Sequence, residues 1–162
     1  MRGWVGLCFA GLAGVPFPSE IAALFSALRR AAGEQGVGEA KRLWGACAWF
    51  TPARQDPSLA AELDVMLADY SGWHWTHQNP AVSLEPPAAE RLSELDRPSL
   101  VVTGDLDFPY HDEIATRLLA GISGARAVRL QGAGHMANME KPSGFNDALL
   151  SFVEQVDSTS VG

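Results

Sequence analysis

The chain has 162 residues, enough for one domain of ordinary size to bury a core without help from disulfides or metals. Apolar residues make up 47% and charged residues 19%, a composition that is typical of a folded globular protein and excludes a disordered one. The net charge is −7, and basic residues adjoin only in Arg29-Arg30 and Lys41-Arg42. We therefore expect no nucleic-acid partner.

The N-terminal stretch admits two interpretations. Met1-Arg2 and the apolar run from Gly3 to Val15 resemble a short signal peptide, but the run contains four glycines and leads into Pro16-Phe17-Pro18. Its part from Trp4 to Ala10 is typical of a strand that is buried on both faces, which is the interpretation we favour. The run is too short to span a membrane, so we expect no membrane span.

The cysteine usage agrees with a cytoplasmic location, which we expect on this ground. Cys8 and Cys47 have neither a metal-like nor a redox-like spacing, and each has apolar neighbours. Two unpaired, small and buried thiols are typical of a reducing compartment.

Residues 19–80 show helical periodicity and no strand-like alternation. Ser19 is the predicted cap of a first helix that ends at Gly33, and further helices are predicted over Gly38–Ala48 and Leu59–Tyr70. We expect a helical insertion between two strands of a sheet. The predicted division is a buried strand and loop over 1–18, a helical segment over 19–85, an α/β core over 86–157 and a disordered tail over 158–162.

The segment from Arg97 to Phe145 carries the residues of chemical interest. It reads as a strand to Thr103, a loop with Asp107, a helix over about Asp112–Ala120, a strand over Ala125–Leu130 and a glycine-rich loop with His135. Strands joined by such a crossover run parallel, and their carboxyl ends share one edge of the sheet.

A carboxylate beside an imidazole fixes the tautomer of the ring and stabilises its protonated form, as in a nucleophile–base–acid system. Taken singly, Asp107 is as well explained as a turn or cap residue, and His135 as a solvated loop residue. The joint placement of the two on one crossover is what indicates a site.

These residues carry a resemblance to the α/β-hydrolase family. The run from Arg97 to Asp107 resembles the acid-bearing strand and loop of that family, and Gly132-Ala133-Gly134-His135-Met136-Ala137-Asn138-Met139-Glu140-Lys141-Pro142 resembles its histidine loop and final helix. The resemblance implies that Asp107, three residues after Gly104, is the acid and that His135 is the base. Asp105 is the weaker candidate for the acid.

The resemblance also implies the architecture: the C-terminal part of an α/β-hydrolase fold, with a short parallel sheet of about three strands, flanking helices and a helical cap or lid. Phe17 and Trp44, Trp49, Trp73 and Trp75 would then either line an apolar pocket or simply pack in the cap. The implied substrate is small, apolar and ester-like. We expect no cofactor and no metal, since His74 and His77 stand at a usable spacing but lack a third ligand.

The sequence departs from this family at the nucleophile. No Gly-x-Ser-x-Gly motif occurs in the 162 residues, and the family carries its nucleophile and oxyanion hole before the acid-bearing strand. One hypothesis is therefore a hydrolase represented by its C-terminal portion, which is inactive alone. The alternative is a non-catalytic remnant or binding module, or a subunit that is completed by an N-terminal segment. An exposed sheet edge would favour self-association or pairing with such a segment.

Overall fold

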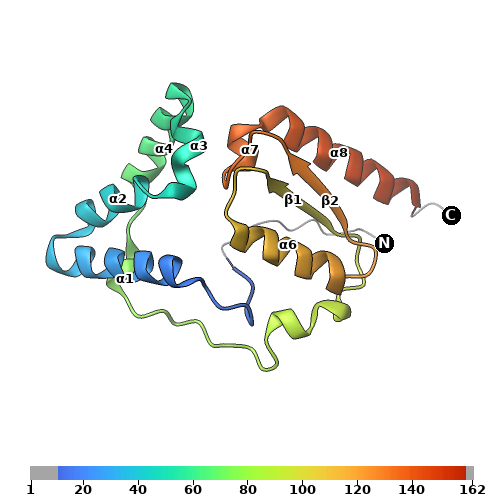
Figure 1. The fold of residues 1–162 in the computed structure, drawn as a ribbon, viewed down its shortest axis with the longest axis horizontal. Coiled ribbons are helices and arrows are strands. Elements are labelled where there is room, and N and C mark those ends of the chain that lie inside the picture. Colours follow the sequence, from blue (N-terminus) through green and yellow to red (C-terminus); the bar gives the residue numbers. More distant parts are fainter. Residues whose placement is uncertain (1–10, 160–162) are drawn as a thin grey trace. The chain divides into compact units, whose positions relative to one another are not determined.

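The computed structural model describes residues 11–159, which fall into two compact units. One unit combines residues 11–16 with 83–159 and contains the sheet (Figure 1). The other unit covers residues 17–82, and all of its regular secondary structure is helical. The strand predicted over Trp4–Ala10 lies outside the described residues.

Two parallel strands form the centre of the α/β unit. Strand β1 (Leu100–Gly104) pairs with β2 (Arg126–Leu130) from Leu100 opposite Arg126 to Gly104 opposite Leu130. Helix α6 (Pro109–Gly121) makes the connection, and it begins three residues earlier than predicted because Pro109 suits the first helical position. Both loops that leave the carboxyl ends of the strands therefore lie at one edge, as the crossover predicts.

Helix α8 (Pro142–Thr159) follows the short helix α7 (Ala137–Glu140), and the strands lie between α6 and α8 in Figure 1. The core between them consists of buried apolar side chains, among them Leu100, Val101, Ile114, Leu118, Leu130 and Phe152. Because α8 runs to Thr159, the helix continues for two residues into the segment predicted as a disordered tail.

Short one-turn 3-10 helices η2 (Ala88–Glu90) and η3 (Leu92–Glu94) precede β1. The segment 11–16 is fastened to this part of the chain. The Ala89 N–H donates to the Ala13 carbonyl at 2.9 Å, and the Tyr110 hydroxyl donates to the Val15 carbonyl at 3.4 Å. Residues 11–16 thus pack in the α/β unit although more than 65 residues separate them from it in the sequence.

The helical unit has six short elements. They are α1 (Ser19–Glu34), α2 (Val37–Gly45), η1 (Ala48–Phe50), α3 (Thr51–Arg54), α4 (Pro57–Asp69) and α5 (Trp73–Thr76). Alanines 31, 32 and 40 are buried where α1 meets α2, with Leu43 and Trp75 packed against them. Trp44 lies 5.0 Å from Trp49 and 5.4 Å from Phe50 between ring centroids, so these aromatics form part of the packing of this unit.

Ser19 does not act as the predicted cap. It is the first helical residue of α1, and its hydroxyl donates to Glu20 at 3.0 Å rather than accepting from a backbone N–H. Helix α4 does have a side-chain cap, because the Asp56 carboxylate accepts from the N–H groups of Ser58 at 2.8 Å and Leu59 at 3.3 Å.

Replacing Asp56 by alanine is expected to destabilise the helical unit by about 1 kcal/mol, because two backbone donors lose their acceptor and a negative charge leaves the positive end of the helix. Asp69→Ala is the matched control, since Asp69 is an equally exposed carboxylate at the opposite end of α4. Urea denaturation measures both. An equal loss in the two variants would contradict a capping role.

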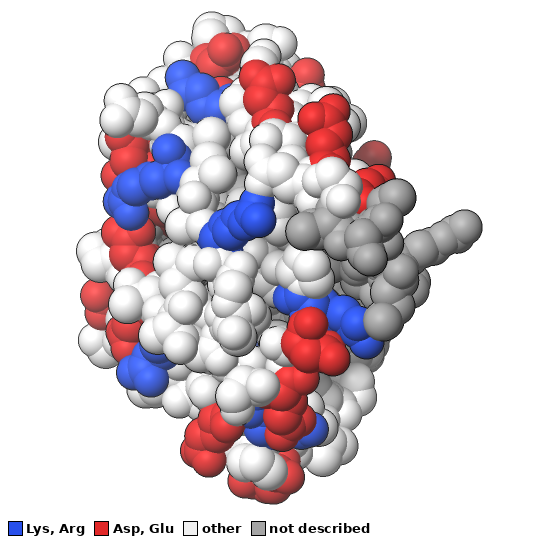
Figure 2. Space-filling view, turned by 90° about the vertical axis from the view of Figure 1, so that its right-hand side faces the viewer, with Lys and Arg blue, Asp and Glu red and all other residues white. Residues whose placement is uncertain are grey.

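Charge is spread over the surface. On the face shown in Figure 2, acidic and basic side chains are interspersed, and the basic ones do not merge into one continuous patch. Several of the basic residues pair locally, for instance Arg42 with Glu39 and Arg117 with Glu113. Within residues 11–159, no helix combines the length and the apolar character needed to cross a bilayer.

Candidate active site

The acid-bearing loop and the histidine loop are held together by their backbones. The Leu106 N–H donates to the Ala133 carbonyl at 2.8 Å, and the Asp105 N–H donates to the Leu130 carbonyl at 3.1 Å. A side chain at Gly104 would overlap the Ala133 carbonyl, so only glycine permits this approach. The last residue of β1 thereby brings the two loops into contact.

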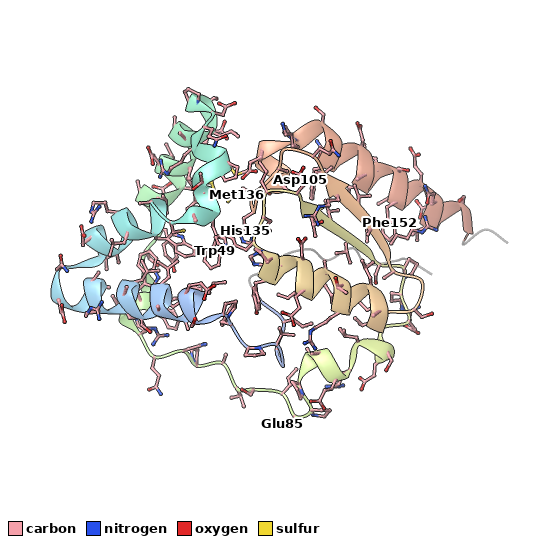
Figure 3. The ribbon with its side chains drawn as sticks, viewed as in Figure 1. Trp49, Glu85, Asp105, His135, Met136 and Phe152 are labelled. Carbon is pink, nitrogen blue, oxygen red and sulfur yellow. The ribbon has the colours of Figure 1, made fainter. Side chains whose placement is uncertain are left out.

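Two carboxylates brace the histidine loop. Asp105 accepts from the Gly132 N–H at 2.7 Å, and Glu140 accepts from the N–H groups of Gly134 and Met136. Asp105, the weaker candidate for the acid, is therefore occupied with the backbone, and Figure 3 shows it and His135 on the neighbouring loops. Glu140 thus holds the backbone of the histidine loop on both sides of His135.

Asp107 and His135 come together as the crossover predicts. The Nδ1 atom of His135 lies 3.1 Å from Oδ2 of Asp107, although 28 residues separate the two in sequence. The Asp107 side chain is 10% exposed and that of His135 is 24% exposed. The carboxylate is thus almost withdrawn from water, while the imidazole still reaches it.

A second histidine shares the same carboxylate. Helix α6 begins at Pro109, so His111 lies in its first turn, four residues after Asp107, and its Nδ1 is 2.9 Å from Asp107 Oδ1. The His111 side chain is 4% exposed, and its ring stacks on that of His135 with centroids 4.5 Å apart. This histidine is not among the site residues that the sequence predicts.

The position of His111 had a local signal in the sequence. An Asp-x-x-x-His spacing brings the two side chains together when the helix begins just after the aspartate, as α6 does here. The predicted start at Asp112 was three residues too late, which left His111 outside the helix. The proline at position 109 was the residue that could have corrected the boundary.

The surroundings of Asp107 favour its ionised form. Burial by itself raises the pKa of this carboxyl group, but hydrogen bonds from His111, from His135 and from the Phe108 N–H (2.7 Å) together lower the pKa well below its usual range. An ionised carboxylate only accepts hydrogen bonds, so both histidines donate to it through Nδ1–H. The Nε2 lone pair of His135 is then the one that can take up a proton.

The lowered pKa of Asp107 predicts a dependence of stability on pH. The stabilisation is fully present above the ordinary carboxyl pKa of about 3.9, and it is lost as the pH falls from there through the lowered value of the folded state. Relative to Asp107→Asn, the wild-type chain should therefore lose an advantage of about 2 kcal/mol on acidification. Denaturant unfolding of both proteins between about pH 7 and pH 2 measures this. A difference that does not change with pH would contradict the assignment.

A pocket opens beside these three side chains. It has a volume of about 300 Å³, and all of the residues that line it belong to the α/β unit. Asp107, His111 and His135 contribute polar atoms, while Val102, Ala115, Ala137 and Phe145 contribute apolar surface, and Asn138 lies at the wall. Among the described residues lining it there is no serine and no cysteine. The pocket thus offers a carboxylate, two imidazole rings and an apolar wall, without a serine or a thiol among its lining residues.

Curated relatives match most of this chain but only part of themselves. A 2-hydroxy-6-oxononadienedioate/2-hydroxy-6-oxononatrienedioate hydrolase of Cupriavidus pinatubonensis is 28% identical over 142 residues, which are 85% of this chain and 47% of that protein. The enzyme with the same name from Klebsiella pneumoniae is 29% identical over 144 residues. The chain thus spans about half the length of the curated relatives it matches. No family's sequence profile matches the chain.

This chain also corresponds to about half the length of similar solved structures. MenH from S. aureus superposes with a TM-score of 0.70 at 17% identity, over 85% of this chain and 53% of that one. A hydrolase from Pseudomonas aeruginosa PA01 reaches a TM-score of 0.64 at 26% identity, over 85% of this chain and 51% of that one. An esterase from Rhodococcus reaches 0.63 at 20% identity. These likenesses extend over both described units of the chain, because each covers more than four-fifths of it.

Proposed function

Since this chain has the α/β-hydrolase fold over about half the length of its relatives, we propose that it supplies the acid and the base of a nucleophile–histidine–acid hydrolase. The hydrogen bond between Asp107 and His135 at the carboxyl ends of two parallel strands is the observation that carries the proposal. This edge is where open α/β sheets bind their ligands.

In the proposed mechanism, His135 removes the proton from a nucleophile that another polypeptide segment provides. Asp107 holds the ring through Nδ1–H, so that Nε2 faces the reaction, and it stabilises the imidazolium that forms. His135 then returns the proton to the leaving group, and later activates water to release the acyl group by the same exchange. Asp107 remains ionised throughout, which its lowered pKa supports.

The substrate we propose is a small, apolar carbonyl compound such as an ester. The apolar side chains at the pocket wall and the modest volume support this class. The curated relatives are named as hydrolases of a dienedioate or trienedioate and one structural neighbour as an esterase, so the named activities differ among proteins that resemble this chain.

We further propose that the helical unit over residues 17–82 is the cap of the hydrolase. Its separate compactness and its position in the sequence, between two parts of the α/β unit, support this role. Among the described residues, β1 pairs with β2 alone, and we propose that the other edge of β1 receives a further strand. A segment that carries the missing strands and the nucleophile is the partner that this edge fits.

Complementation tests the proposed function. The chain is co-expressed with the N-terminal half of a homologous hydrolase, including its Gly-x-Ser-x-Gly motif, and turnover of short p-nitrophenyl esters is measured. We expect turnover that depends on His135 in the complemented pair and none above a His135→Ala control in the chain alone. A soluble complex without such turnover would favour the non-catalytic alternative. His135-dependent turnover by the chain alone would reveal a nucleophile within it.

A further inference from the structure

Three potential metal ligands converge at the candidate active site. Asp107 offers a carboxylate oxygen, His111 and His135 each offer a ring nitrogen, and the ligand atoms all lie within 4.8 Å of one another. We propose that this Asp107–His111–His135 cluster is a binding site for a first-row divalent transition-metal ion, of which Zn²⁺ is the ion to test. The proposal concerns binding and does not depend on the hydrolase function.

The donor set indicates the class of ion. Two imidazole nitrogens and one carboxylate form the set found in one kind of zinc site, which leaves the fourth position for water. Calcium and magnesium prefer oxygen ligands alone, so the two histidines disfavour them. Each histidine serves as a neutral ligand if its proton moves from Nδ1 to Nε2, which leaves the charge of the ring unchanged. The single carboxylate then offsets part of the charge of the ion.

The geometry is within reach of tetrahedral coordination. Bonds of about 2.0–2.2 Å place the ligand atoms of a tetrahedral zinc site roughly 3.4 Å apart. In this structure the three candidate ligand atoms are separated by 4.8 Å at most. Shifts of each side chain by roughly an ångström or less would therefore bring them to tetrahedral spacing. His135 lies on a loop and is 24% exposed, which makes it the ligand with room to adjust, whereas His111 is fixed in α6.

The cluster also has an entry route and outer support. All three side chains line the pocket of about 300 Å³, so an ion and its fourth ligand reach them from one side. The Phe108 N–H holds Asp107 at 2.7 Å, and contacts of this kind orient metal-binding carboxylates. The depth of burial distinguishes this cluster from groups of exposed acids, since Asp107 is 10% and His111 is 4% exposed.

The other two histidines of the chain form a weaker rival. His77 Nδ1 is within hydrogen-bond distance of Thr76 Oγ1 (2.9 Å) and of the Trp73 carbonyl (3.1 Å), and its ring stacks on that of Trp73. It provides only two ring nitrogens together with His74, which is on the four-residue helix α5, while His77 directly follows that helix. Among residues 11–159, the Asp107–His111–His135 cluster is the one group of three or more such ligands.

Metal binding and proton transfer by His135 would exclude each other. An ion held by Asp107 and His135 replaces the hydrogen bond through which the carboxylate orients the imidazole. This consequence alone rests on the proposed function: in an active hydrolase the ion is an inhibitor that competes for the acid–base pair.

Titration of the untagged, chelator-treated full-length chain tests the site without any substrate. Isothermal calorimetry with Zn²⁺ should show one ion bound per chain, and Co²⁺ should give the visible absorption of a tetrahedral site. His111→Phe, which keeps a ring in the buried position, and Asp107→Asn should each weaken binding by more than about tenfold. The double variant His74→Ala/His77→Ala is the matched control and should bind as the wild type does.

A second measurement keeps the test independent of whether the variants fold. In ¹⁵N-labelled wild-type chain, Zn²⁺ should shift the imidazole signals of His111 and His135 and leave those of His74 and His77 in place. Shifts confined to His74 and His77, equal affinity in His111→Phe, or no binding at millimolar Zn²⁺ would each overturn the proposal. Because no turnover is measured, a failed complementation experiment leaves this result unaffected.

Discussion

Replacing His135 by alanine in the complemented hydrolase is expected to lower kcat by about 10⁴-fold to 10⁶-fold. In the proposed mechanism the side chain is both the base that activates the nucleophile and the acid that protonates the leaving group, so its loss removes both proton transfers from every turnover. The hydrogen bond to Asp107 at 3.1 Å is the structural basis for this expectation. KM should change little, because His135 acts on the reacting atoms rather than on the remainder of the substrate.

The variant Asp107→Asn tests the proposed role of the carboxylate in the same mechanism. An amide at this position can donate to the imidazole and so favour the wrong tautomer of His135, which in triads of this type costs on the order of 10⁴-fold. Asp105→Asn is the matched control, because Asp105 is a carboxylate in the same loop whose contact is with the Gly132 N–H. Steady-state kinetics with p-nitrophenyl esters measures all three variants. A larger loss in Asp105→Asn than in Asp107→Asn would reassign the acid.

Gly104→Ala is expected to destabilise the α/β unit by about 3 kcal/mol or more, an effect of overpacking at its severe end. A Cβ at this position would meet the Ala133 carbonyl carbon and oxygen and the Gly134 carbonyl oxygen, which are backbone atoms and cannot rotate away. The strand end and the histidine loop would have to separate, and their hydrogen bonds would be lost with them.

Gly144→Ala is the matched control in the same unit. Its Cβ would lie 3.3 Å from the end of the Leu130 side chain, which can move, and alanine is the better helix former in α8. We expect a change within about 1 kcal/mol. Thermal and urea unfolding, followed by circular dichroism, measure both variants. Similar stabilities of Gly104→Ala and the wild type would contradict the close approach of the two loops.

The order of elements in the α/β unit followed from local patterns. The proline-led apolar run before Gly104 became β1. The short run that ends at Leu130 became β2; it contains two arginines, but it is β-like and lies between Gly124 and Gly132. The crossover rule then placed Asp107 and His135 at one edge without any knowledge of long-range contacts. Sequence patterns do not show which acceptor the first N–H groups of a helix find, so the predicted Ser19 cap of α1 is wrong and the Asp56 cap of α4 was not predicted.

The sequence by itself thus determined the fold class, the two parallel strands and the placement of Asp107 beside His135, because these depend on local periodicity and on a topological rule. Only the tertiary structure decided which groups the carboxylates of Asp107, Asp105 and Glu140 bind. Asp107 receives two histidines, while Asp105 and Glu140 hold the backbone of the histidine loop. It also revealed His111 as a member of the site. Hydrogen-bond partners across 28 residues depend on where two loops meet in space, and no pattern within either loop encodes that distance.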